Sequence, residues 1–189
     1  AAEAIAAAHQ AGVRKFIDVG CDLATSQVCV EHAAAFDQVY ATVGLHPHES
    51  QHGLDGLEAL LANPKVIAVG ECGLDYHYDH SPRDAQRSMF AAQIDLAHRH
   101  DLPLVIHTRE AWEETFEVLD SEGVPSHTIF HCFTGGPDDA TECLQRGAWL
   151  SFSGIVSFKS ATDVQHAAVL CPLDKLLVET DSPFLAPVP

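Results

Sequence analysis

The sequence is short of basic residues, of long apolar runs and of paired cysteines. It holds 10 Lys and Arg against 27 Asp and Glu, which gives a formal net charge of −17 at pH 7. A surface this acidic repels the phosphate backbone of nucleic acid unless metal ions or a local basic patch intervene. The composition therefore excludes a protein that binds nucleic acid through a broad basic face.

No apolar run approaches the ~20 residues that a helix needs to cross a bilayer. The alanine-rich start, "AAEAIAAAHQAG", contains Glu3 and lacks a positively charged stretch, so it is unlike a signal peptide. None of the six cysteines has CxxC spacing, which argues against a zinc ribbon or a redox motif. We expect buried thiols in a reducing compartment, a cytoplasmic location and no membrane contact.

The length and composition are those of one globular domain. The chain has 189 residues, 47% of them apolar, which is enough for a sizeable core. No linker, low-complexity tract or break in composition interrupts it. We expect a single domain over residues 1–189.

Short apolar runs alternate with helical patterns. Seven runs suit strands that are buried on both faces of a parallel sheet: 15–20, 38–46, 66–71, 102–107, 127–133, 148–154 and 175–181. The chain begins in a helical pattern, and further helices are predicted at 81–101, 109–123, 136–147 and 160–170.

The helix at 81–101 carries the clearest signals. Ser81 is a plausible N-cap, Pro82 suits the first helical position, and the apolar face would include Met89, Ile94 and Leu96.

This alternation predicts an α/β fold with a parallel sheet and helices outside it. A closed (β/α)₈ barrel has eight strands, so we expect a TIM-type (β/α) barrel with seven of the eight strands present. An open doubly wound sheet is the competing architecture. It is disfavoured because no GxGxxG follows a strand and because polar residues end many strands instead of lining one crevice.

Strand after strand ends on a residue that can bind metal. These residues are His46, Glu71, His107, His131 and Asp181. The carboxyl ends of barrel strands meet on one face, where active sites lie. One such residue is more often a loop contact, and either central histidine could be an inert core residue. Five at equivalent positions indicate a common site.

The chemistry of this set is mixed imidazole and carboxylate, which suits hydrolytic sites for Zn²⁺, Mn²⁺ or Mg²⁺. A carboxylate can bridge two ions about 3.5–4 Å apart, as two-metal phosphoesterases require. Asp181 could act as a general base, because its place at a strand end lets it face an attacking water.

Six segments resemble, in order and spacing, the motifs of the TatD family of metal-dependent deoxyribonucleases. They are "VGLHPHE", "AVGECGLDYHY", "LPLVIHTREA", "IFHCFTGG", "LSFSGIVSFKSA" and "LLVETDSPFLAPVP", and the resemblance runs over essentially the whole chain. The resemblance implies a TIM-like barrel of the amidohydrolase type that cleaves phosphodiester bonds of DNA with a divalent metal, Mg²⁺ first and Mn²⁺ or Zn²⁺ as alternatives.

The resemblance also implies roles for four residues of the set. Glu71 matches the family's metal-bridging glutamate, and His107 and His131 match the histidines of the second metal. Asp181 matches the aspartate that binds the first metal and is positioned to activate water. On this basis Glu71, His107 and His131 complete one ion site, and Glu71 and Asp181 supply the other. Glu71 and Asp181 are the expected catalytic residues.

Substrate contacts are implied beside these ligands. His46 and His48 match a loop near the site, and His46 would contact a phosphate or a metal-bound water. Arg109 would pair with a substrate phosphate or, equally, with a neighbouring acid. The expected partner is a single-stranded DNA end, and no obligate protein partner is indicated.

The chain departs from the family pattern at both ends. The D-x-H-x-H element of the first strand is absent, and Pro189 comes before the basic loop and final helices. We expect a fragment of the barrel.

Two other functions stay open. One is a hydrolase of small esters or amides on the same barrel, although Glu71 stands where many such enzymes carry a carboxylated lysine. The other is a barrel without catalytic activity.

Overall fold

The computed structural model describes residues 1–188, and Pro189, where the sequence analysis placed the end of the fragment, lies outside them. Seven parallel strands form one sheet in which the order in space is the order in sequence. They are β1 (Phe16–Val19), β2 (Val39–Val43), β3 (Val66–Asp75), β4 (Leu104–Arg109), β5 (Thr128–Phe130), β6 (Trp149–Phe152) and β7 (Leu176–Val178). The predicted α/β fold of the TIM type, with seven strands, is confirmed.

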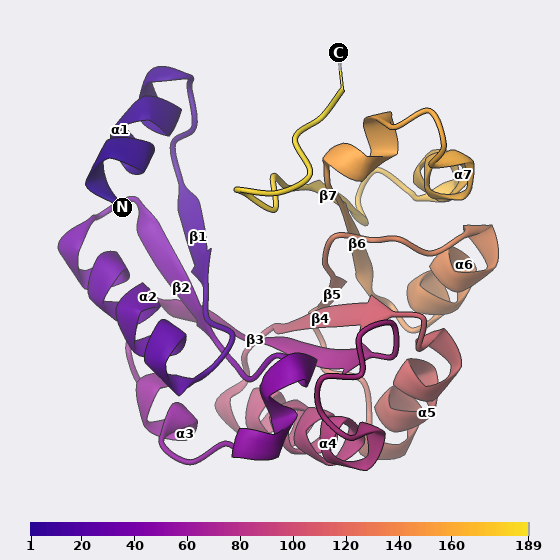
Figure 1. Cartoon of the computed structure of the whole chain (residues 1–189), viewed down its shortest axis with the longest axis horizontal. Helices are drawn as coiled ribbons and strands as arrows, with labels where there is room; N and C mark the ends of the chain where they lie inside the picture. The colour runs from indigo at the N-terminus through magenta and orange to yellow at the C-terminus, as the bar shows by residue number, and fades with distance from the viewer. Residues whose placement is uncertain (189) are drawn as a thin grey trace.

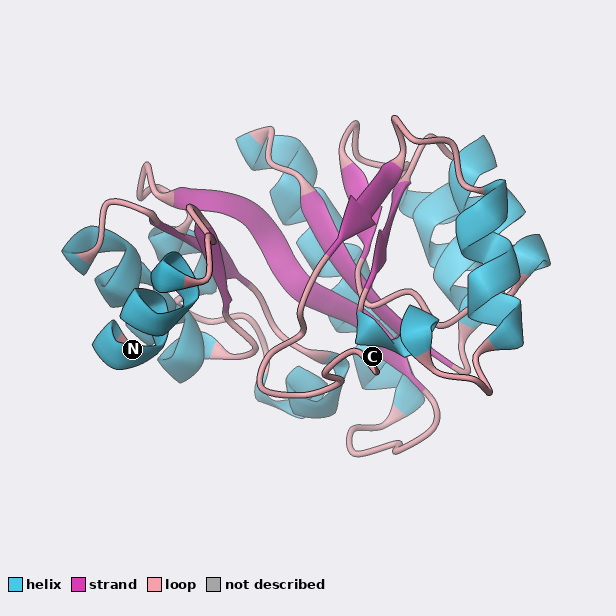
Figure 2. Cartoon of the chain, turned by 90° about the horizontal axis from the view of Figure 1, so that it is seen from above, coloured by secondary structure: helices cyan, strands magenta, loops and turns pink. Residues whose placement is uncertain are grey.

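The sheet curls into an arc, and the helices cover its outer, convex side (Figure 1). The helices are α1 (Ala2–Gln10), α2 (Leu23–Ala35), α3 (Leu57–Leu60), α4 (Arg83–His100), α5 (Trp112–Glu122), α6 (Pro137–Gln145) and α7 (Thr162–Leu170). Two 3₁₀ turns, η1 (Pro47–His52) and η2 (Gly154–Ser157), follow β2 and β6. Figure 2 shows the same strands from above, with helices along both flanks. The helices thus leave the concave side of the arc uncovered (Figure 1).

Helix α4 differs in detail from its prediction. Pro82, not Ser81, is the residue before its first turn, and Met89 is only half-buried. Its inner face instead buries Phe90 together with two glutamines. Gln86 Oε1 accepts from Asp75 N at 2.8 Å, and Gln93 Oε1 accepts from Leu45 N at 2.7 Å. The helix therefore fixes the backbone at the carboxyl ends of β3 and β2.

Helix α2 was not predicted. Its only buried residues are Ser26, Cys29 and Ala33, so it lacks a stripe of large apolar side chains. Its start is nevertheless encoded, because Asp22 Oδ1 accepts from Thr25 N at 2.7 Å and Thr25 Oγ1 accepts from Asp22 N at 3.0 Å. A capping signal without apolar periodicity is easily overlooked.

The core lies between the sheet and the outer helices. It includes Leu104 and Ile106 of β4 and Phe130 of β5, which are at most 1% exposed. Trp112 of α5 packs on Phe130 and Phe133, with ring centroids 5.9 and 5.2 Å apart. This packing holds the carboxyl ends of the central strands in place.

The sheet does not close on itself. β1 pairs only with β2, and β7 only with β6, so each leaves one edge unpaired. Apolar side chains are exposed on both strands, with Ile17 59% and Val178 80% exposed. Within residues 1–188, no helix combines the length and apolarity required to span a membrane. The single domain over residues 1–189 stays a prediction.

Candidate metal centre

The predicted residues are carried by the carboxyl ends of neighbouring strands. His46 follows β2, and its N–H donates to Cys21 O at 2.8 Å, while Glu71 N donates to Gly20 O at 3.1 Å. β3 continues to Asp75, beyond the predicted strand end at Glu71, so Glu71 lies within the ladder. These backbone bonds from β1 hold both side chains in register.

Glu71 is the centre of the arrangement. Its Oε1 lies 2.7 Å from His131 Nε2, 3.0 Å from His107 Nδ1 and 3.4 Å from His46 Nε2. The side chain is only 12% exposed. The structure therefore brings together Glu71, His46, His107 and His131, which lie up to 85 positions apart in the sequence.

Two groups of three side chains could each hold a cation. One is His46, Glu71 and His107, and the other is His131, Glu179 and Asp181; the ligand atoms within each lie within 4.8 Å of one another. The sequence analysis had assigned His131 to the ion of Glu71 and His107. In the structure Asp181 lies with His131 in the second group, while His131 Nε2 also lies 2.7 Å from Glu71 Oε1, so the predicted assignment stays a prediction.

Glu179 was missed by the sequence analysis. Its Oε1 lies 3.3 Å from His131 Nδ1 and accepts from Cys132 N at 2.9 Å. A signal was present, because Glu179 precedes Asp181 by two positions and side chains repeat every second residue along an extended segment.

Asp75 was missed too. It is almost completely buried, and its Oδ2 lies 3.0 Å from both His107 Nε2 and His48 Nε2. Its Oδ1 accepts from the backbone N–H groups of His77 and Tyr78 at 3.0 and 2.9 Å. The alternation Glu71, Gly73, Asp75 along β3 was the available signal. Asp75 fixes the ring of His107 from the side opposite Glu71.

The two remaining predicted residues lie at the mouth of the centre. The ring of His48 is 4.3 Å from that of His46, between centroids. Arg109 lies over the ring of Tyr78, its guanidinium carbon 4.9 Å from the centroid. Within the described part of the chain no carboxylate pairs with Arg109, so the predicted ion pair with a neighbouring acid is not formed there.

The charges of the centre support one another. Burial alone would raise the pKa of Glu71, but the charge of His131 and the hydrogen bonds from His107 and His131 hold that pKa well below its usual range. Burial alone would lower the pKa of His131, but the charge of Glu71 and the bond to Glu179 raise it to about 10. Without a cation, the proton that His131 holds therefore offsets the negative charge of Glu71.

A family model described as "TatD related DNase" matches residues 1–189. The chain belongs to the TatD family. It is 40% identical to an "uncharacterized metal-dependent hydrolase YabD" of Bacillus subtilis. The match covers 99% of this chain and 75% of that protein. A "3'-5' ssDNA/RNA exonuclease TatD" of Citrobacter rodentium is 34% identical over 98% of this chain and 73% of that protein.

A solved structure gives the same result for the fold. YJJV, a TATD homolog from Escherichia coli K12, superposes with a TM-score of 0.87 at 29% identity, over 95% of this chain and 71% of that one. The resemblance to the TatD family is thus confirmed, and the chain is a metal-dependent hydrolase of this family.

The residues of the TatD-family centre fit divalent cations. Both groups combine imidazole nitrogen with carboxylate oxygen, the donor set of hydrolytic Zn²⁺, Mn²⁺ and Mg²⁺ sites. No thiolate belongs to either group, although Cys21 Sγ lies 3.8 Å from Glu71 Oε2. All six cysteines are free; four are buried as expected, whereas Cys21 and Cys132 are half-buried beside the centre.

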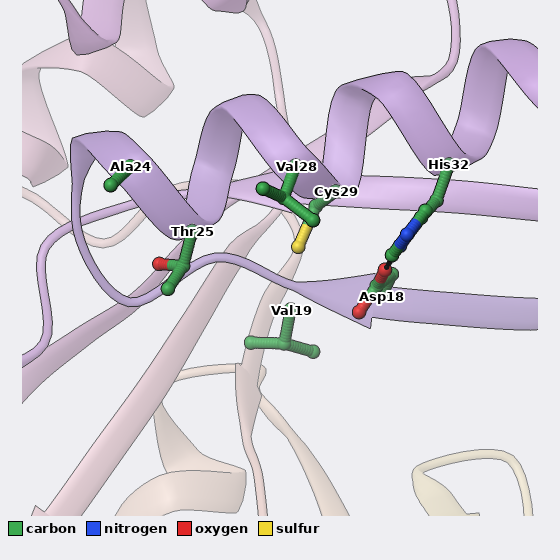
Figure 3. A pocket seen from close by; sticks show the side chains of 7 residues that line it. All are labelled: Asp18, Val19, Ala24, Thr25, Val28, Cys29 and His32. Carbon is green, nitrogen blue, oxygen red and sulfur yellow. Dashed lines mark hydrogen bonds and ion pairs between the residues drawn. The ribbon is translucent and has the colours of Figure 1, made fainter. Parts of the chain in front are cut away.

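A separate hollow lies between α2 and β1, away from this centre (Figure 3). Asp18 Oδ2 pairs there with His32 Nδ1 at 2.7 Å, and Val19, Val28 and Cys29 complete much of the lining. Its polar groups are already paired with each other, and its walls are apolar. The hollow therefore lacks a set of converging imidazoles and carboxylates like the one at the strand ends.

Proposed function

We propose that this TatD-family hydrolase cleaves phosphodiester bonds at single-stranded ends of DNA. The observation that carries the proposal is the position of Glu71, whose Oε1 lies within 3.4 Å of three imidazoles beside a second group of His131, Glu179 and Asp181. Two adjoining cation sites are what two-metal hydrolysis of a phosphodiester requires. The exonuclease name of the Citrobacter rodentium relative supports the same substrate class.

The proposed metal ligands are Glu71, His107, His131 and Asp181, with His46 and Glu179 added from their positions in the two groups. A bound divalent cation supplies positive charge to the phosphate and acidifies a nearby water. Glu71 and Asp181 are the proposed catalytic residues: Glu71 as the ligand shared between sites, and Asp181 as the general base that accepts a proton from the attacking water. Mg²⁺ is the proposed ion, with Mn²⁺ and Zn²⁺ as alternatives.

The proposed substrate contacts are His46, His48 and Arg109. Arg109 carries a guanidinium without a carboxylate partner among residues 1–188, so it is available to a phosphate. His48 is oriented by Asp75 and faces the same mouth. The six free thiols support the proposed cytoplasmic location, because a reducing compartment keeps cysteines unpaired.

A second candidate function is hydrolysis of small phosphoesters, other esters or amides. The net charge of −17 favours it, because an acidic surface repels a long polyanion.

The test uses a single-stranded oligonucleotide labelled at its 5′ end, so that every product shortened from the 3′ end keeps the label, incubated with and without Mg²⁺ or Mn²⁺. We expect a ladder of shortened products that requires metal, and none from Glu71→Ala or Asp181→Asn. Glu117→Ala removes an exposed carboxylate from α5 and is the matched control, expected to cleave like the wild type. Metal-dependent turnover of a small ester without any DNA cleavage would favour the second candidate. Inactivity towards all substrates would favour a barrel without catalysis.

A further inference from the structure

An aromatic cluster stands at the mouth of the metal centre. Its central ring is Tyr78, in the loop after β3, which is 51% exposed. The ring of His80 lies parallel to it, with an interplanar angle of 2° and centroids 5.5 Å apart. His48 and His77 meet Tyr78 edge-on at 5.6 and 4.6 Å, and Arg109 lies over the ring. Large exposed rings next to a polar centre commonly mark a binding surface.

The cluster is held in place by the same buried carboxylate that orients the metal centre. Asp75 Oδ1 accepts from Tyr78 N at 2.9 Å, and Asp75 Oδ2 lies 3.0 Å from His48 Nε2. These contacts fix the loop and one of the flanking imidazoles. The ring of Tyr78 is thus presented to solvent by a supported backbone.

The cluster includes one cation without a carboxylate partner among residues 1–188, Arg109, whereas His77 lies 2.8 Å from Glu110 and His48 lies 3.0 Å from Asp75. Four of the six arginines pair with carboxylates in the part of the chain that the structure describes: Arg83, Arg87, Arg99 and Arg146. Arg109 does not, and its contact there is the face of Tyr78. A free guanidinium beside an exposed ring suits a ligand that is both anionic and aromatic.

The cluster lies next to the proposed reacting centre. His48 touches the ring of His46, at 4.3 Å between centroids, and His46 Nε2 lies 3.4 Å from Glu71 Oε1. Two imidazoles therefore separate the ring of Tyr78 from the shared carboxylate. A strand whose phosphate reached the proposed cation sites beside Glu71 would bring a neighbouring base to Tyr78.

We propose that Tyr78 is a stacking site for one unpaired nucleobase and that Arg109 contacts the phosphate attached to that nucleotide. The proposal rests on the proposed nuclease function and deepens it, because it explains a preference for single strands. Every base has a π-face, so such a site accepts all sequences, whereas bases inside a duplex are already stacked and paired. Base–aromatic stacking predicts about a 5- to 150-fold effect on affinity.

The experiment compares two 3′-labelled oligothymidylates, one normal and one with abasic residues at its terminal positions, in Mg²⁺. The ratio of their kcat/KM values measures the contribution of the base. We expect a ratio of at least about 5 for the wild type, a ratio near 1 for Tyr78→Leu, and a ratio close to that of the wild type for Tyr78→Phe, which keeps the ring. Thermal unfolding of each variant checks that it is folded.

Trp149→Leu is the matched control. Trp149 stacks on His127 at 5.5 Å and lies under Lys175 Nζ at 3.5 Å, so it forms a similar cluster at the amino ends of the strands. We expect its ratio to match that of the wild type. A wild-type ratio near 1 overturns the stacking site and leaves the nuclease function intact, even if Tyr78→Leu fails to fold. A protein that cleaves neither oligonucleotide, but does hydrolyse a small phosphoester, overturns both proposals.

Discussion

At the scale of single residues, the centre is organised by two carboxylates on one strand. Glu71 faces three imidazoles. Asp75, four positions later, contacts the Nε2 atoms of His107 and His48. A histidine that binds a metal with one nitrogen usually gives its other nitrogen to such a carboxylate, which sets the tautomer and the ring orientation. Asp75 thus supports the metal centre without belonging to either three-residue group.

Asp75→Asn tests this support. The amide still accepts from the N–H groups of His77 and Tyr78, so we expect the fold to be kept, but it no longer offers a carboxylate to His107 Nε2 and His48 Nε2. We expect Mn²⁺ affinity, measured by titration calorimetry, to fall by about 10- to 100-fold. Asp79→Asn, which removes an exposed partner of Arg83, is the control and is expected to bind Mn²⁺ normally. Unchanged affinity in Asp75→Asn would refute its supporting role.

The pKa of His131 predicts how the metal-free protein responds to pH. Glu71 and Glu179 raise this pKa to about 10, above the ordinary value of about 6.5. The protonated ring of His131 therefore stabilises the folded state fully below about pH 6.5, and this stabilisation is lost as the pH rises towards 10. The pKa of Glu71 is lowered, so its contribution is present above about pH 4.5 and is lost only on acidification.

Thermal unfolding in EDTA between about pH 6.5 and 7.5 measures this effect, because a free thiol ionises only near about pH 8.5. We expect the melting temperature of the wild type to fall over this range and to fall less in His131→Gln. Equal slopes for the two proteins would show that His131 is not held in its charged form.

At the scale of elements, β3 and β4 approach each other unusually closely beside the centre. Gly73 pairs with His107 and has a φ of 131°, a region that side chains rarely adopt. A Cβ on Gly73 would lie 2.0 Å from His107 O. The backbone of β4 therefore reaches its position because residue 73 has no side chain, and this contact sets the position of His107.

Gly73→Ala is expected to destabilise the protein by at least about 3 kcal/mol, through backbone strain and displacement of β4. Urea unfolding followed by circular dichroism measures the change. Gly147→Ala is the matched control, because Gly147 has a φ of 78° but nothing lies within 4 Å of its Cβ position. The control should lose about 1–2 kcal/mol. A similar loss in both variants would mean that the clash with β4 is relieved at little cost.

The sequence predicted the elements better than the contacts between them. Apolar runs identified all seven strands, because strands buried on both faces read as continuous Val and Ile stretches. Helix α2 was not predicted, because it has no stripe of large apolar side chains. The burial of Gln86 and Gln93 could not be predicted either, because polar residues usually face solvent. The metal-binding types at strand ends were visible, whereas the grouping of His131 with Glu179 and Asp181 depends on side-chain directions that only the fold sets.

At the scale of the whole fold, the arc formed by residues 1–188 leaves one edge of β1 and one edge of β7 unpaired. Unpaired edges with apolar side chains are templates for association with another chain. Ile17 on β1 and Val178 on β7 are both largely exposed.

We expect a chain of residues 1–189 alone to self-associate as its concentration rises and expect Ile17→Lys to weaken this association by about fivefold or more, since a lysine on an edge strand opposes pairing. Sedimentation velocity over a concentration series measures the effect. Val169→Lys is the control, because Val169 is 87% exposed but lies on helix α7. An equal effect of both substitutions would point to general charge repulsion instead of edge pairing.

The strands are adjacent in space in the order of the sequence, so the sheet can form strand by strand during synthesis on the ribosome. Each strand can add to the one made just before it, without waiting for a distant part of the chain. His46, Glu71 and His107 have all been synthesised once β4 has emerged, whereas Glu179 and Asp181 follow only after β7. A nascent chain can thus capture its first cation well before the second half of the centre has been translated.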